Sequence, residues 1–231
     1  MASQARDSIP VPQVPINEKY KSLFGSINAF VRNYMSKYDN SHDYNHILRV
    51  VSNTNRILQA ELARDPSLTY DTTALFLAAL LHDVGDHKYV QPGQESDFTI
   101  LDILVDHGSG WELGVIVQEI VDHVSYSHEI RDPAATAKAL AAYPELAIVQ
   151  DADRLDAIGA VGIGRCFSFG AAKMLDQPMD RAIEHFGEKL FNLGDMMKTE
   201  TGKQMAKKRT EVLKEFAKQW EEEAKLSFEV L

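Results

Sequence analysis

The feature that most limits how this chain can fold is the segment at residues 72–85, TTALFLAALLHDVG. From Ala74 to Leu81 every side chain is apolar, and the run is rich in alanine and leucine. Continuous apolarity of this length and composition favours a helix over a strand. A helix that is apolar on every side must also be covered on every side. The segment therefore predicts a buried central helix that ends near Gly85.

Other segments show the spacing of helices that bury one face. From Asn17 onward, apolar residues recur at three- and four-residue steps, and the next helix follows a break at KYDNSHD, with Ser41 or Asp43 as its cap. Further helices are expected at 96–108 (capped by Ser96), 111–124, 145–159, 161–173, 179–193 and 202–225. Residues 88–95 and 125–135 are expected to be loops. Without any alternating strand pattern, the predicted fold class is all-α, a single compact helical bundle.

The chain is expected to form one domain with a short extension. Residues 1–16, with three prolines in SIPVPQVP, predict a flexible N-terminal arm. The remainder, 17–231, is long enough for one helical domain, with C-terminal helices at 178–226. A homodimer through the amphipathic terminal helices is one open possibility.

Composition excludes several classes of function. No apolar run approaches the roughly 20 residues that span a bilayer, and the N-terminus lacks the apolar core of a secretory signal. The single cysteine, Cys166, excludes an intrachain disulfide, which favours a reducing, cytoplasmic compartment. The net charge of −10 argues against binding a nucleic-acid polymer. A small phosphorylated substrate stays compatible with this charge, because a bound cation can invert the local field.

Histidines and acids cluster in four short strings. Seven of the eight histidines lie between residues 42 and 128, and most stand beside an acid. The strings are SHDYNH at 41–46, LLHDVGDHK at 80–88, DHVSYSH at 122–128 and VQDADRLDAIG at 149–159. Imidazole and carboxylate groups at the end of a buried helix cost several kcal/mol unless something pairs with them. A metal ion would be such a partner.

Two of these strings also have an ordinary structural interpretation. His82 could cap the C-terminus of the apolar helix while Asp83 begins a turn. In the last string, Asp151, Asp153 and Asp156 lie among apolar residues, where acids repel one another unless Arg154, a cation or protonation compensates. The apolar flanks fit poorly with a solvated acidic face, so this string favours a functional site.

Taken in order, His46, His82–Asp83 and Asp153 resemble the H…HD…D signature of the HD-domain metal-dependent phosphohydrolase superfamily. The strings SHDYNHILRV, LLHDVGDHKY and DADRLDAIGAVGIGR are similar to its small stand-alone nucleotide phosphohydrolase branch, and the resemblance covers roughly residues 25–175. It implies an all-α HD-domain bundle in which those four side chains hold one divalent ion. The implied chemistry is attack of metal-activated water on a phosphate ester or anhydride.

The resemblance also implies roles for neighbouring residues. Asp86 resembles an acidic position that could serve as general base, next to the catalytic ligand Asp83. Asp151 and Asp156 are expected to lie behind the ligands. The residues proposed to contact substrate are Arg49, His87, Lys88, His42, His123, His128 and Arg154. For Arg49 and Arg154, a structural ion pair with a neighbouring acid is an equal alternative.

The mixed nitrogen and oxygen ligand set suits Mn, Fe, Co, Ni or Zn, with Mg less favoured. The expected substrate is a nucleotide: a triphosphate that releases pyrophosphate, or a monophosphate that releases phosphate. Two alternatives stay open. A di-iron oxygenase of the same fold would recruit a further histidine such as His123, and a non-catalytic sensor would keep the site only for binding nucleotide or metal.

Overall fold

The computed structural model describes residues 10–85 and 99–228, and every regular element within those ranges is a helix. The α-helices are α1 (Lys21–Met35), α2 (Tyr44–Arg64), α3 (Thr72–Leu81), α4 (Ile100–Asp106), α5 (Trp111–Asp122), α6 (Tyr126–Arg131), α7 (Pro133–Ala142), α8 (Glu145–Asp156), α9 (Gly159–Lys173), α10 (Asp180–Glu188) and α11 (Glu200–Glu223). Two 3₁₀ segments, η1 (Glu18–Tyr20) and η2 (Leu190–Met196), precede α1 and α11. The all-α prediction is confirmed.

Helix α3 is the buried centre of the bundle, as its sequence predicts. Side chains from Ala74 to Leu81 are fully buried, and α1, α2, α5 and α8 pack around them. The helix begins where the Asp71 carboxylate accepts hydrogen bonds from the backbone N–H groups of Thr73 and Ala74. Because α3 is enclosed, the polar residues that follow it emerge inside the molecule rather than at its surface.

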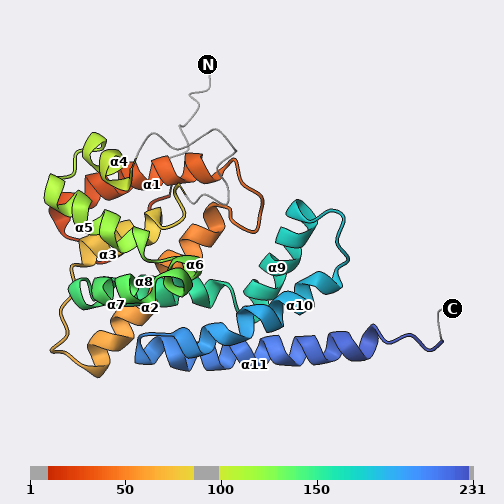
Figure 1. Ribbon diagram of the computed structural model, residues 1–231. Coiled ribbons are helices and arrows are strands. Elements are labelled where there is room, and N and C mark those ends of the chain that lie inside the picture. Colours follow the sequence, from red (N-terminus) through yellow and green to blue (C-terminus); the bar gives the residue numbers. More distant parts are fainter. Residues whose placement is uncertain (1–9, 86–98, 229–231) are drawn as a thin grey trace, which may run out of the picture.

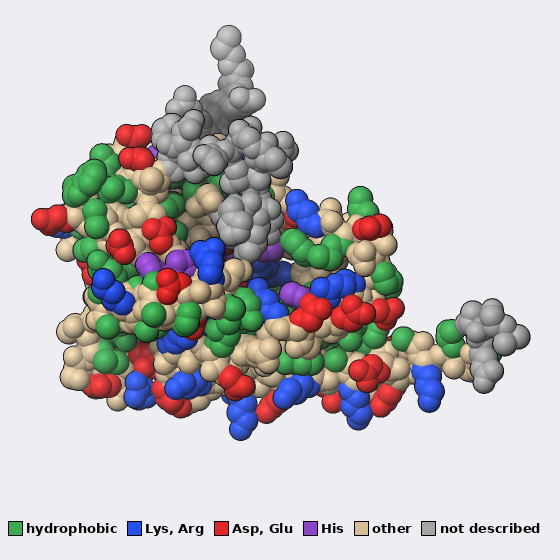
Figure 2. Space-filling model, in the orientation of Figure 1, with side chains coloured by type: hydrophobic (Ala, Val, Ile, Leu, Met, Phe, Trp, Pro, Cys, Tyr) green, Lys and Arg blue, Asp and Glu red, His purple; other side chains and the backbone are tan. Residues whose placement is uncertain are grey.

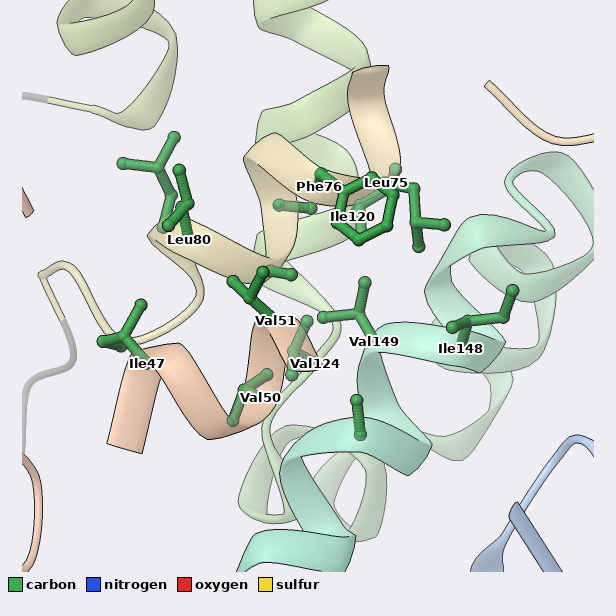
Figure 3. Packing of buried hydrophobic residues seen from close by; sticks show 14 of the residues in the cluster. Ile47, Val50, Val51, Leu75, Phe76, Leu80, Ile120, Val124, Ile148 and Val149 are labelled. Carbon is green, nitrogen blue, oxygen red and sulfur yellow. The ribbon is translucent and has the colours of Figure 1, made fainter. Parts of the chain in front are cut away.

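Helices α2 and α8 pack against each other beside α3. Figure 3 shows Val50 and Val51 of α2 close to Val149 of α8, with Val124 between the helices. All four side chains are buried. This packing brings the first turn of α2 next to the last turn of α8, although the two lie far apart in the sequence. The predicted metal ligands on these helices are thereby placed within reach of one another.

Two local predictions were wrong. Helix α4 starts at Ile100 and is capped by Thr99 in a reciprocal capping box with Asp102, whereas the expected cap, Ser96, lies outside the described residues. Residues 125–135, expected as a loop, contain α6 and the start of α7. Ser125 caps α6, while Asp132 caps α7 ahead of Pro133, which suits a first helical turn because it lacks an N–H. The polar composition and the proline were thus signs of helix starts.

The C-terminal part forms a second layer. Figure 1 shows α11 running along one side of the molecule, with α9 and α10 projecting beyond the part that contains α3. The first turn of α11 is joined to the body by two buried acids: Asp151 of α8 accepts from the Thr199 backbone N–H at 2.7 Å, and Glu61 of α2 from that of Thr201 at 2.9 Å.

The expected N-terminal arm is described only from residue 10. Residues 10–16 contain no helix, and their Val11, Val14 and Ile16 pack against the core. Among the residues that the structure describes, no single helix is long and apolar enough to cross a membrane; α8 and α9 reach that length only as a pair bent by 69°.

Candidate metal centre

Three segments deliver the predicted ligands to one place. His46 lies in the first turn of α2, which begins where the Asp43 carboxylate accepts from the His46 backbone N–H at 3.1 Å. His82 and Asp83 follow α3 directly, in a turn that closes at Gly85 with a φ of 81°. This backbone conformation favours glycine, which explains the glycine at the end of the turn. Asp153 comes from the last turn of α8.

The ligating atoms of these residues converge. His46 Nε2 lies 3.2 Å from His82 Nε2 and 3.2 Å from Asp83 Oδ2. Donor atoms of these three residues all lie within 4.8 Å of one another, which is a geometry that can hold a metal ion. Asp153 Oδ1 lies 3.6 Å from His46 Nε2 and 3.7 Å from His82 Nε2. Both imidazoles are buried, while Asp153 is the most exposed of the four.

The hydrogen bonds behind the two imidazoles decide which nitrogens face the cluster as acceptors. His46 Nδ1 lies 2.8 Å from Asp156 Oδ2, and His82 Nδ1 lies 3.0 Å from the Ala79 carbonyl oxygen. Both partners accept, so each Nδ1 carries the proton and each Nε2 presents a lone pair. Two lone pairs and two carboxylates thus face one another, and Asp83 Oδ2 is buried without a hydrogen bond to any residue within 10–85 and 99–228. The donor set fits a divalent cation.

Electrostatics point the same way. Burial alone would lower the pKa of His82, but the charges of Asp83 and Asp153 outweigh burial and raise it to about 9. Burial would raise the pKa of Asp83, yet the neighbouring imidazoles of His82 and His46 hold it well below its usual range. The pKa of Asp153 is likewise lowered, through its contact with His82, against the effect of burial. The cluster therefore attracts positive charge, as a metal centre does.

Asp156 lies behind His46 and accepts from several donors. Its carboxylate accepts from Arg49 Nε at 2.8 Å and Nη2 at 3.0 Å, and Arg165 Nη1 lies 3.1 Å away. Burial would raise the pKa of Asp156, but the hydrogen bonds from His46 and Arg49 lower it to about 2. Arg49 is thus seen in the structural ion pair, one of its two open alternatives. Arg165, to which sequence reasoning gave no role, completes the group and also donates to the Ser41 carbonyl.

Asp151 and Arg154 point away from the cluster. The Asp151 carboxylate accepts from the backbone N–H groups of Lys198 and Thr199, so it anchors the start of α11 rather than a ligand. Arg154 is buried, with its guanidinium on Glu129 and on the Met196 carbonyl. Arg154 therefore forms a structural ion pair, which was one of its two open alternatives beside contact with substrate. Of the two aspartates, Asp153 is the one that lies at the cluster.

The other residues proposed for substrate contact lie at different places. His42 lies beside the cluster, its ring centroid 5.9 Å from that of His46, with Ser41 Oγ 2.7 Å from its Nδ1. Burial, together with the charge of Arg165, lowers the pKa of His42 to about 4. The rings of His123 and His128 contact each other at a centroid distance of 4.7 Å. Asp86, His87 and Lys88 lie outside the described residues, so their proposed roles stay predictions.

A cavity of about 250 Å³ adjoins the cluster. His82 forms part of its wall, and Ser127, His128 and Arg131 of α6 form another part. Figure 2 shows histidine and basic side chains gathered on this face around α6. Sequence reasoning did not single out Arg131, although its position three residues after His128 places both on one helical face. Within residues 10–85 and 99–228, only the His46–His82–Asp83 group meets the distance criterion for a metal cluster.

Comparison with known proteins agrees with the fold and the site. The profile of the HD domain family matches residues 43–158, half of the chain, and this range contains all four predicted ligands. The protein YpgQ of Bacillus subtilis strain 168 is 35% identical over 199 residues, which are 85% of this chain and 91% of YpgQ. The chain therefore belongs to the HD domain family, whose members are metal-dependent hydrolases.

Solved structures show the same architecture. YpgQ crystallised in complex with ADP superposes with a TM-score of 0.64 at 31% identity, over 86% of this chain and 93% of YpgQ. A protein of Lactobacillus plantarum gives a TM-score of 0.69 at 27% identity, over 90% and 98% of the two chains. An HD-superfamily hydrolase of Bacillus thuringiensis gives 0.55 at 29% identity, over 86% and 94%.

Proposed function

We propose that this protein is a metal-dependent phosphohydrolase that acts on a nucleotide, with His46, His82, Asp83 and Asp153 as the metal ligands. The observation that carries this proposal is the convergence of two imidazole lone pairs and two carboxylates from three distant segments. A divalent ion bound there would lower the pKa of a water molecule and polarise a phosphate group. The ligand set suits a transition metal better than magnesium.

Residues around the proposed ligands orient the two histidines and supply positive charge near the cluster. Asp156 holds the proton of His46 Nδ1, which keeps the opposite nitrogen available as a ligand. The Ala79 carbonyl does the same for His82. Arg49 and Arg165 balance the charge of Asp156 and leave positive charge close to the cluster, where a phosphate would bind. Asp86 as general base, with His87 and Lys88 as phosphate contacts, completes the proposal from the sequence.

Two relatives support the substrate class. YpgQ was crystallised with ADP, and the protein of Bacillus thuringiensis is an HD-superfamily hydrolase. The cavity beside His82 also has basic groups on the wall formed by α6, and such groups suit a phosphate. Hydrolysis would release pyrophosphate from a triphosphate or phosphate from a monophosphate.

The test is a panel of nucleoside mono-, di- and triphosphates assayed with Mn²⁺, Co²⁺ or Mg²⁺, with separate detection of phosphate and pyrophosphate. We expect turnover of at least one nucleotide by the wild-type protein and none by His82→Ala, which should also lose most of its metal. His107→Ala is the matched control, because His107 is the C-cap residue of α4 and its ring Nδ1 bonds to the Ile103 carbonyl of that helix. Full metal retention and activity in His82→Ala would refute the assignment.

A further inference from the structure

The short helix α6 presents two different faces. Successive helical residues are about 100° apart, so Ser127, His128 and Arg131 share one side while Glu129 points away from Ser127 and Arg131. The first three residues line the cavity that His82 also lines. Glu129 instead faces α8 and the residues before α11.

Glu129 anchors α6 on the face that is turned away from the cavity. Its carboxylate accepts from Arg154 and from Lys198 Nζ, the latter at 2.6 Å, and Gln150 Nε2 lies 3.3 Å away. Arg154 is the residue next to the proposed ligand Asp153. This ion cluster fixes α6 relative to the last turn of α8, so the cavity wall is built at a defined distance from the metal cluster.

The face toward the cavity carries one buried donor without an acceptor among the described residues, at His128. Arg131 Nη2 lies 3.3 Å from His128 Nδ1, and since a guanidinium only donates, Nδ1 accepts and the proton of a neutral His128 is on Nε2. That Nε2 is buried and has no hydrogen-bond partner among the residues that the structure describes. A buried donor left in this state costs free energy, so it indicates a ligand with acceptor oxygens.

Asp122 is the acid on the same cavity. Its carboxylate accepts from Gln118 Nε2 at 2.6 Å, and burial raises its pKa. When ionised, this carboxylate repels an anion in the cavity. Any attraction for an anion must therefore come from Arg131 and His128. The hydroxyl of Ser125 caps α6 by accepting from the His128 backbone N–H at 3.1 Å. His128 and Arg131 are therefore the groups through which this wall would bind an anion.

We propose that His128 and Arg131 form an anion subsite that binds a phosphate group of the substrate other than the one hydrolysed at the metal cluster. This inference rests on the proposed function and adds which residues distinguish the length of the phosphate chain. A substrate with two or more consecutive phosphates reaches both places, whereas a monophosphate reaches only one. Arg131 and His128 should thus determine the preference for di- and triphosphates.

The test compares AMP, ADP and ATP as substrates of metal-loaded wild type, Arg131→Ala, Arg131→Lys and His128→Ala. We expect Arg131→Ala and His128→Ala to raise KM for ADP and ATP about ten- to a hundred-fold, the range for loss of a hydrogen bond to a charged group. The values for AMP, kcat and metal content should change little, and Arg131→Lys should recover part of the loss. Lys218→Ala, which removes a charge from exposed α11, is the control and should match the wild type.

The outcomes separate this inference from the proposed function. If the variants change KM equally for all three nucleotides, or for none, the subsite is refuted while the hydrolase stands. If the wild type hydrolyses no nucleotide, the proposed function fails, and calorimetric binding of ADP and AMP tests the subsite alone. Weaker binding of ADP but not AMP by Arg131→Ala then supports it, whereas unchanged binding, or no ADP binding by the wild type, overturns it.

Discussion

At the scale of single residues, the orientation of His46 depends on a carboxylate that touches no metal. Asp156 is almost fully buried and bonds to His46, Arg49 and Arg165 together. These donors keep it ionised, so it stabilises the proton on Nδ1 and the lone pair on Nε2. The affinity of the centre for metal therefore depends on Asp156, which contacts a ligand but not the metal.

We predict that Asp156→Asn lowers metal affinity about 10- to 100-fold, the usual loss when a partner behind a ligating histidine is replaced. The amide keeps the shape of the side chain but loses the charge that holds the imidazole proton. Competition against a chelating indicator dye measures the change. Glu200→Ala, which replaces an exposed acid in the first turn of α11, is the control and should bind metal like the wild type. Equal affinity in Asp156→Asn and wild type would contradict this role of Asp156.

At the scale of elements, Asp151 links α8 to the start of α11. Its carboxylate accepts from Lys198 N at 2.8 Å and from Thr199 N and Oγ1 at 2.7 Å. Thr199 in turn caps α11 through the Gly202 backbone N–H. A Cβ on Gly202 would collide with this carboxylate, which explains the glycine at the position. One buried acid therefore sets where the C-terminal helix begins.

We predict that Asp151→Ala lowers the free energy of unfolding by about 2–4 kcal/mol, since buried N–H groups lose their acceptor. Denaturant unfolding measures this change. The control is Glu200→Ala, which alters an exposed acid in the first turn of α11 and should cost under about 0.5 kcal/mol. A similar small change in both variants would show that Asp151 is not an anchor.

The elements that could be predicted from sequence are those with strong local signals. Asp43, one of the two expected caps, begins α2, and the apolarity of residues 74–81 shows that α3 is central. The two helices in residues 125–135 were missed because capping residues and a proline look like a loop when read singly.

The roles of individual side chains in the site were less accessible to sequence reasoning. Asp151 and Asp156 are both buried acids on α8, and only the packing of α2 and α11 shows that they face different partners. Arg131 and Arg165 lacked any local pattern, because what gives them a role is a cavity in one case and a distant acid in the other.

At the scale of the whole molecule, the metal centre joins segments that are remote in the chain. His46 and its partner Asp156 are 110 positions apart, and His82 lies 36 positions after His46. A ligand that binds only the folded state stabilises that state. Without metal, the facing carboxylates and lone pairs lose the partner that their arrangement requires.

We predict that removing metal with a chelator lowers the midpoint of thermal unfolding by about 5–10 °C, the shift for a metal held at about a hundred times its Kd. Adding back Mn²⁺ or Co²⁺ in excess should restore it. The His82→Ala variant is the control and should show no shift with either treatment. An identical midpoint with and without metal in the wild type would contradict a coupling between ion and fold.

The hydrogen bonds between Asp151 and the start of α11 have a practical consequence for work on this family. The segment that matches the family profile stops at residue 158, but the acid two positions before Asp153 finds its partners at 198 and 199. A fragment trimmed to the matching range would leave that acid buried with nothing to accept from. Shortened versions intended for crystallisation or engineering should therefore keep the long terminal helix, even though it contributes no ligand.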